Sequence, residues 1–172
     1  MDSFLELLTK DFDSNPLFAF FSKEEFDEFL DIATIEKFGS GEVLFKKDDE
    51  PQGLYFFFQG KVQITRAKPN RPPRVIAEIE APTILGEMAM LVHRLRTSTA
   101  TTLSESTVLL FARDDYNRLL GENNLMAFKL SHNMGIILAK RIEMMNKSMM
   151  DTKQEFKEFS SFKNSLFNDW NF

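Results

Sequence analysis

The chain has 172 residues, of which 43% are hydrophobic and 27% charged, and its formal net charge is −5. This length and composition are typical of one globular domain and exclude a disordered chain. The negative charge argues against a nucleic-acid partner, which needs clustered Lys and Arg to neutralise phosphates. The lack of cysteine excludes disulfides, thiol catalysis and cysteine-bound zinc. The chain opens with no signal-peptide pattern and has no apolar run long enough to span a bilayer, so we expect a cytoplasmic protein without a membrane partner.

Residues 1–33 are expected to form the N-terminal helices of the domain. Ser22 and Glu25 have the spacing of a capping box, which predicts a helix that runs through Leu30. Pro16 separates this helix from a shorter one predicted at Ser3–Lys10.

Residues 34–112 change to short runs with the punctuation typical of β-strands. The basic segment Arg66–Arg74 has a charge that could contact nucleic acid or acidic lipid. Because it is short and contains several prolines, we interpret it as an exposed hairpin loop. This many short antiparallel strands predict a jelly-roll barrel, so the fold class is expected to be α+β. The candidate strands are Thr34–Phe38, Val43–Lys46, Leu54–Gln59, Lys61–Arg66, Arg74–Ile79, Arg96–Leu103 and Thr107–Phe111.

Residues 113–150 are predicted to form C-terminal helices that serve as a lid or in dimerisation. Gly121 breaks the first helix, and Asn123 or Asn124 can cap a longer one that reaches roughly to Met150. Apolar residues on this helix follow a 4-3-4 spacing, which is typical of a helix that packs along its length and favours a homodimer. These residues, called the seam below, are Leu138, Ile142, Met145 and Met149.

Residues 151–172 are predicted to be an aromatic helical tail. A stripe this apolar should be covered, whether by the barrel, by a second subunit or by another protein partner. The residues of this stripe are Phe156, Phe159, Phe162, Leu166 and Trp170.

The segment 85–100 has the residue types of an anion site. Gly86 has no Cβ, so a ligand can approach the backbone there. Residues 87–91 can form one helical turn whose first N–H groups have no internal partner and suit an anion. Arg96 has a planar guanidinium that can grip a phosphate with two N–H groups, and it is followed by the hydroxyls of Thr97 and Ser98.

The pattern Gly86-Glu87-x-Ala89-x-Leu91, followed after four residues by Arg96-Thr97-Ser98, resembles the phosphate-binding cassette of cyclic-nucleotide-binding domains. The family includes kinase regulatory subunits, nucleotide-modulated channels and the bacterial catabolite activator. The resemblance extends from residue 15 to about residue 150. It includes the runs Asn15-Pro16-Leu17-Phe18, Gly41-Glu42-Val43-Leu44-Phe45 and Gly60-Lys61-Val62, together with Tyr55.

The resemblance implies a sensor for cyclic AMP or cyclic GMP. Glu87 would accept the ribose 2′-OH and Arg96 would pair with the cyclic phosphate. The implied ligand-binding residues are Gly86, Glu87, Met88, Ala89, Arg96, Thr97 and Ser98. In this family a Thr directly after the arginine often favours cyclic GMP, and Thr97 occupies that place, so both nucleotides stay open. The C-terminal helix would form a lid over the base, with Met134, Arg141 and Met145 as candidates.

Two positions depart from the family pattern. The turn after the second strand usually holds glycines and here reads Asp48-Asp49-Glu50-Pro51, although Asp tolerates unusual backbone angles. Ser98 stands where Ala is usual. The alternative hypothesis is a barrel that does not bind ligand, in which Arg96 pairs with Glu87 and the chain acts as a dimerisation or protein-interaction module.

The two histidines, His93 and His132, show no metal-ligand or Ser-His-Asp pattern. We therefore expect neither a metal site nor catalysis.

Overall fold

The computed structural model describes residues 15–68, 71–92 and 94–168, and the side chains of these residues except for 68 and 153–168. The helix predicted at Ser3–Lys10, Trp170 and the other tail side chains lie outside this description. The elements in chain order are η1 (Pro16–Phe18), α2 (Lys23–Ile32), β1 (Thr34–Phe38), β2 (Val43–Phe45), β3 (Gly53–Gln59), β4 (Lys61–Lys68), β5 (Arg71–Glu80), β6 (Thr83–Leu85), α3 (Glu87–Val92), β7 (Thr99–Thr102), β8 (Ser106–Ala112), α4 (Arg113–Gly121) and α5 (Leu125–Asn168).

The predicted capping box at the start of α2 is confirmed. Ser22 Oγ accepts from Glu25 N at 3.3 Å, and Glu25 Oε2 accepts from Ser22 N at 2.6 Å. These two bonds satisfy backbone donors that a helix start leaves without partners. Before α2, the ring of Phe18 packs edge-on against Phe26 and Phe29, which joins the N-terminal helices to the core.

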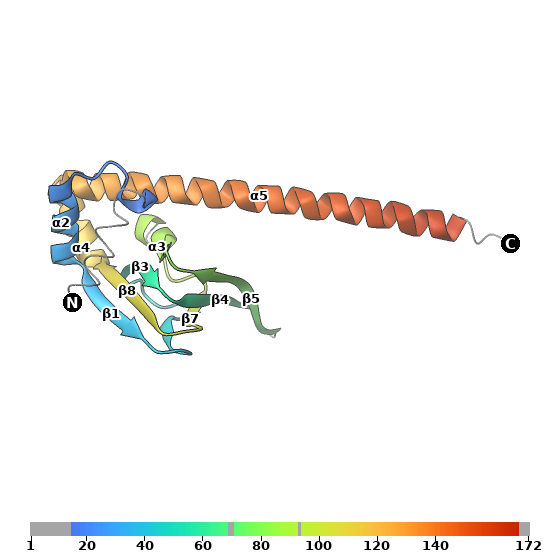
Figure 1. Cartoon of the computed structure of the whole chain (residues 1–172), viewed down its shortest axis with the longest axis horizontal. Coiled ribbons are helices and arrows are strands. Elements are labelled where there is room, and N and C mark those ends of the chain that lie inside the picture. Colours follow the sequence, from blue (N-terminus) through green and yellow to red (C-terminus); the bar gives the residue numbers. More distant parts are fainter. Residues whose placement is uncertain (1–14, 69–70, 93, 169–172) are drawn as a thin grey trace.

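The eight strands form two antiparallel four-stranded sheets, which is consistent with the jelly roll that the sequence predicts, but the sheets do not close into a barrel. One sheet has the order β1-β8-β3-β6 and the other β2-β7-β4-β5, so each sheet keeps two edge strands (Figure 1). Leu44, Val62 and Ala100 from one sheet pack against Tyr55 and Val108 from the other. This layer of side chains holds the two sheets face to face as a sandwich.

Strand β3 is buried on both faces, which explains its unbroken apolar sequence. Tyr55 and Phe57 point between the sheets, whereas Leu54 and Phe56 point toward the helices. The neighbouring strand β8 follows the same rule, with Val108 inside the sandwich and Phe111 on the helix side. Because strand side chains alternate between faces, a strand covered on both sides loses the polar alternation of a half-buried strand.

The turn Asp48-Asp49-Glu50-Pro51 forms without glycine. Asp48 has φ +71°, a left-handed conformation that Asp adopts more readily than most residues. The turn also holds the backbone of Arg96, since Asp48 N donates to Arg96 O at 2.8 Å and Arg96 N donates to Asp49 O at 2.9 Å. The strand predicted from Arg96 therefore begins later, at Thr99, and Arg96 lies in the loop before β7.

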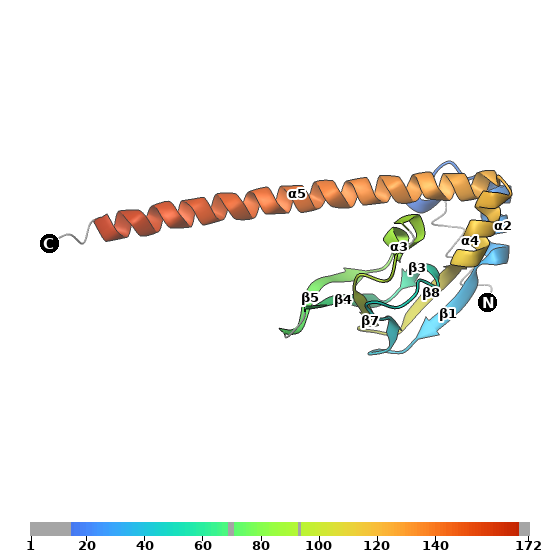
Figure 2. The ribbon, with the colours of Figure 1, turned by 180° about the vertical axis from the view of Figure 1, so that it is seen from behind.

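Helix α5 is a single 44-residue helix that passes Met150 without a break, so the predicted helix end there is wrong. Asn124 caps it, because its Oδ1 accepts from Met126 N at 2.9 Å. Residues 136–168 contain neither Pro nor Gly, so nothing in this stretch stops the helix. Figures 1 and 2 show its C-terminal half extending far beyond the strands. Within the described part of the chain, no helix is long and apolar enough to cross a membrane.

Asn133 fastens α5 to the start of the domain. Its fully buried side chain donates from Nδ2 to Leu17 O at 2.8 Å and to Ala19 O at 2.6 Å. Leu17 lies in η1 and Ala19 directly follows it. This one amide therefore joins two segments that are 116 and 114 residues apart in the sequence.

Replacement of Asn133 by Ala should destabilise the domain. The change leaves buried carbonyl groups without their donor, and we expect the free energy of unfolding to fall by about 1–3 kcal/mol. Urea denaturation followed by circular dichroism measures the difference. Asn146→Ala, at an exposed position of the same helix, is the matched control and should leave the midpoint unchanged. Equal midpoints for the Asn133 variant and the wild type would contradict this role.

Candidate functional site

A cavity of about 220 Å³ opens between the β2-β7-β4-β5 sheet, the cassette (residues 85–100) and α5. The sheet and β6 supply apolar walls, and the cassette supplies the polar groups. All seven residues that the sequence predicts for ligand binding line this cavity. The full lining is Phe45, Ile64, Ala77, Ile79, Leu85, Gly86, Glu87, Met88, Ala89, Arg94, Leu95, Arg96, Thr97, Ser98 and Arg141.

Arg96 is buried at the inner side of the cavity, with only 3% of its surface exposed. Its Nη2 donates to Gly53 O at 2.8 Å. Its guanidinium carbon lies 4.3 Å from the centre of the Phe45 ring and 5.5 Å from that of Tyr55. Within the described residues, its Nε and Nη1 are buried and have no hydrogen-bond partner. The guanidinium is thus fixed in place, and the N–H groups of Nε and Nη1 remain available to a ligand.

The environment of Arg96 is unfavourable for its own charge. Burial lowers the pKa of the Arg96 guanidinium below its ordinary value, because the charged form has lost its hydration. The rings of Phe45 and Tyr55 compensate in part, since a cation is attracted to an aromatic face. A buried cation with unpartnered N–H groups is costly unless an anion joins it. The site therefore favours an anionic ligand.

Glu87 forms an ion pair with Arg141 of α5, not with Arg96 as the non-binding alternative assumed. Arg141 Nη1 donates to Glu87 Oε1, and Arg141 Nη2 donates to Ile84 O at 2.9 Å. Among the residues that the structure describes, no group bonds to Glu87 Oε2. Glu87 is buried and Arg141 half-buried, so this contact attaches α5 directly to the cassette.

Gly86 makes room for the guanidinium. Its φ is +97°, which an L side chain rarely adopts. A Cβ at this position would collide with Arg96 Nη1 and would lie 2.8 Å from Gly53 O. The close approach that the sequence predicts at Gly86 is therefore made by Arg96 itself. Gly86 O also starts α3, where it accepts from Ala89 N and Met90 N at 3.1 Å.

The three lid candidates lie in different surroundings. Arg141 lines the cavity, whereas Met134, nearer the start of α5, is fully buried in the core. Met145 is exposed, one turn beyond Arg141, and does not line the cavity.

Sequence reasoning missed the cavity walls. Phe45, beneath the guanidinium, and Ile64 and Ala77 on neighbouring strands line the site. The alternation of Val62 and Ile64 in β4 indicates which residues face inward, but the sequence does not say which strand lies opposite the cassette.

The comparison with known families agrees with this geometry. The family model for the cyclic nucleotide-binding domain matches residues 35–123, just over half of the chain. The cyclic AMP receptor protein of Thermus thermophilus is 29% identical over 128 residues, which cover 74% of this chain and 57% of that protein. The cAMP-dependent protein kinase regulatory subunit of Dictyostelium discoideum is 29% identical over 87 residues, or 49% of this chain and 27% of that protein.

Solved structures show the same fold. The catabolite activator protein of Thermus thermophilus superposes with a TM-score of 0.66 at 26% identity, covering 78% of this chain and 62% of that one. This chain thus spans little more than half of the bacterial receptor and about a quarter of the kinase subunit, 57% and 27% respectively. Because the family model matches more than half of its residues, this chain belongs to the cyclic nucleotide-binding domain family.

Proposed function

We propose that this chain is a regulatory module that binds cyclic AMP or cyclic GMP in the cavity beside Arg96 and acts in the cytoplasm. The observation that carries the proposal is the guanidinium of Arg96, which is 3% exposed and has Nε and Nη1 without partners in the described structure. A cyclic phosphate is a single negative charge with acceptor oxygens, which suits both the charge and the free N–H groups. No catalytic step is needed for this role.

The phosphate would lie between Arg96 and the start of α3. Backbone N–H groups near Met88, at the first turn of this short helix, and near Thr97 would donate to its oxygens. The N–H of Ala89 donates to Gly86 O in this structure and would have to exchange that partner for the phosphate. Ser98 has a hydroxyl at the cavity wall and can add a donor. Gly86 lets the guanidinium approach α3 closely enough for both to reach one phosphate.

The ribose would bind at Glu87. Arg141 already occupies Oε1, while Oε2 bonds to no described residue and is open to a hydroxyl donor. The 2′-OH of the ribose is such a donor, and a hydrogen bond to a charged carboxylate is stronger than one between neutral groups.

The base would lie against the apolar wall of Ile64, Ala77 and Ile79, which suits the flat face of a purine. Cyclic AMP is the first candidate, because both relatives are named for it. The hydroxyl of Thr97, at the cavity wall, keeps cyclic GMP as the second.

The output of binding would travel through α5. Arg141 connects the cassette to this helix through Glu87 and Ile84 O. A ligand that engages Glu87 changes the free energy of this contact and can shift the position of α5, to the extent that it binds one position better than the other.

We also propose that α5 pairs with the α5 of a second copy. The seam residues Ile142, Met145 and Met149 are exposed on a helix that leaves the domain. The same spacing continues in the sequence through Thr152 to Phe156 and Phe159, on backbone that is still helical. A long exposed helix with such a stripe is typical of a coiled coil. If no nucleotide binds, the chain would act through this pairing alone.

Removal of the Arg96 guanidinium should abolish most of the binding. For Arg96→Ala we expect a loss of about 2–5 kcal/mol, or about 30-fold and more in Kd, since the buried charge that meets the phosphate is gone. Isothermal titration with cyclic AMP and with cyclic GMP measures this. Lys37→Ala, which removes an exposed positive charge from β1, is the control and should bind as the wild type does. Equal affinities of the Arg96 variant and the wild type would falsify the proposal.

Loss of Arg141 should weaken both the fold and the binding. Arg141→Gln removes the partner of buried Glu87, and we expect about 1–2 kcal/mol of destabilisation, less than for a fully buried pair because the arginine side chain is 30% exposed. Scanning calorimetry should report a Tm lower by roughly 2–8 °C. The same variant should bind nucleotide more weakly, since Glu87 is no longer positioned. Lys140→Gln, the exposed neighbour, should change neither quantity, and an unaltered Tm in Arg141→Gln speaks against the contact.

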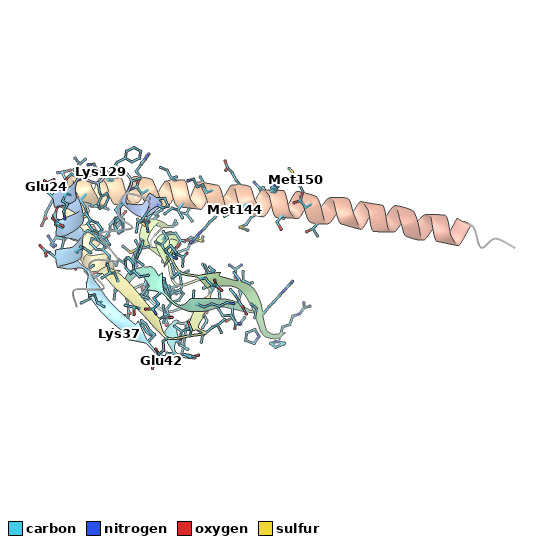
Figure 3. All side chains as sticks on the ribbon, viewed as in Figure 1. Glu24, Lys37, Glu42, Lys129, Met144 and Met150 are labelled. Carbon is cyan, nitrogen blue, oxygen red and sulfur yellow. The ribbon has the colours of Figure 1, made fainter. Side chains whose placement is uncertain are left out.

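Charges in the seam should separate the dimer. The double variant Ile142→Glu, Met149→Glu places like charges at facing positions, and light scattering after size exclusion should report a monomer. Met144→Glu, Met150→Glu is the matched control, because these exposed methionines lie on the same stretch of α5 but outside the seam (Figure 3). A wild type that is monomeric at micromolar concentration, or a control that dissociates as readily as the seam variant, contradicts pairing through this face.

A further inference from the structure

The β4–β5 hairpin ends in a two-stranded ribbon that leaves the body of the domain. Strand β7 pairs with β4 only from Val62 to Thr65, and β5 is an edge strand. Beyond Thr65 the ribbon therefore has no third strand, and residues 71–76 are all exposed. Figures 1 and 2 show this end reaching out past the other strands in both views. An isolated ribbon is stabilised poorly by its own contacts.

Residues of like charge face one another across the two strands of this ribbon. The strand register places Arg66 opposite Arg74 and Lys68 opposite Arg71. Like charges directly opposite each other destabilise a strand pair. The nearest acidic residue in the sequence, Glu78, is already bonded to Lys61. No salt bridge joins Arg66, Arg71 or Arg74 to any residue in the described ranges. An acidic chain thus concentrates three arginines without an ion-pair partner in the described ranges at one exposed end, at a cost to its own stability.

Aliphatic side chains lie beside these charges. Val75 and Ile76 are 48% and 52% exposed, and both line the same surface hollow of about 370 Å³ as Arg66, Arg71, Pro72 and Arg74. Basic and aliphatic groups side by side suit the interface of a membrane, where the charges meet phosphates and the aliphatic groups enter the headgroup region. Residues 61–80 contain no aromatic residue, so the ribbon lacks the rings on which single-stranded nucleic acids stack.

We propose that the end of the β4–β5 hairpin, with Arg66 on one strand and residues 71–76 on the other, binds the surface of membranes that contain anionic phospholipids. The sequence alone favours an ordinary exposed loop here and no membrane partner. The register of like charges, the missing third strand and the exposed aliphatic pair are the observations that change this interpretation. The surface is separate from the nucleotide cavity, so the inference does not depend on the proposed function.

Sedimentation of the full chain with phospholipid vesicles tests the inference. The wild type should bind vesicles of phosphatidylcholine and phosphatidylserine in equal parts, and should leave vesicles of phosphatidylcholine alone in the supernatant. Each arginine near a charged membrane contributes about fivefold to partitioning, so Arg74→Gln should bind about fivefold more weakly, and Arg71→Gln, Arg74→Gln about 25-fold. Ile76→Ser should also weaken binding, and added salt should weaken it for all forms.

Lys37→Gln is the charge-matched control, because it removes one positive charge at the opposite end of the domain (Figure 3). It should bind vesicles as the wild type does. Arg74→Gln relieves a like-charge opposition, so its Tm should be equal to or above that of the wild type, and its nucleotide affinity should be unchanged. No binding to anionic vesicles, equal losses in Arg74→Gln and Lys37→Gln, or tighter arginine-dependent binding to a labelled oligonucleotide than to vesicles would each overturn the inference.

Discussion

The site depends on one unfavourable arrangement, the buried guanidinium of Arg96. Proteins seldom bury a cation without an anionic partner, because lost hydration costs several kcal/mol. Here Gly53 O and the ring of Phe45 hold the group in place, and two of its nitrogens have no partner within the described structure. A Cβ at residue 86 would collide with this guanidinium, and Asp48 N in the adjoining turn donates to Arg96 O. The surrounding fold thus holds a positive charge that an anionic ligand would neutralise, as proposed above.

The second constraint is the contact between Glu87 and Arg141. It connects the cassette with α5, whose far end lies well outside the domain (Figure 2). Because α5 is a single helix without a break between Leu125 and Asn168, the proposed displacement at the cassette would be transmitted along its whole length. The seam lies on this helix, and the hairpin end with its opposed arginines projects from the neighbouring sheet. Ligand, second copy and membrane would therefore each meet a different surface of one small domain.

The sequence predicted most of the local structure correctly. The capping box at Ser22, the turn at Asp48 and the cap at Asn124 depend on neighbours within a few residues, which the sequence displays directly. The predicted end of α5 at Met150 is wrong. The helix continues to Asn168 because residues 151–168 contain no residue that stops a helix. The three-residue strand β6 was missed, since so short a run has no periodicity of its own.

The amino-acid sequence by itself determined the family, the cassette and the two residues on which recognition would depend, Glu87 and Arg96, because these follow from residue type and spacing. Tertiary structure decided what each of them contacts. In the tertiary structure the strands form two separate sheets and Phe45 lies beneath the guanidinium of Arg96. Glu87 pairs with Arg141, and Met134 is buried in the core. Each of these depends on residues far apart in the chain, and spacing along the sequence holds no information on which distant segments will pack together.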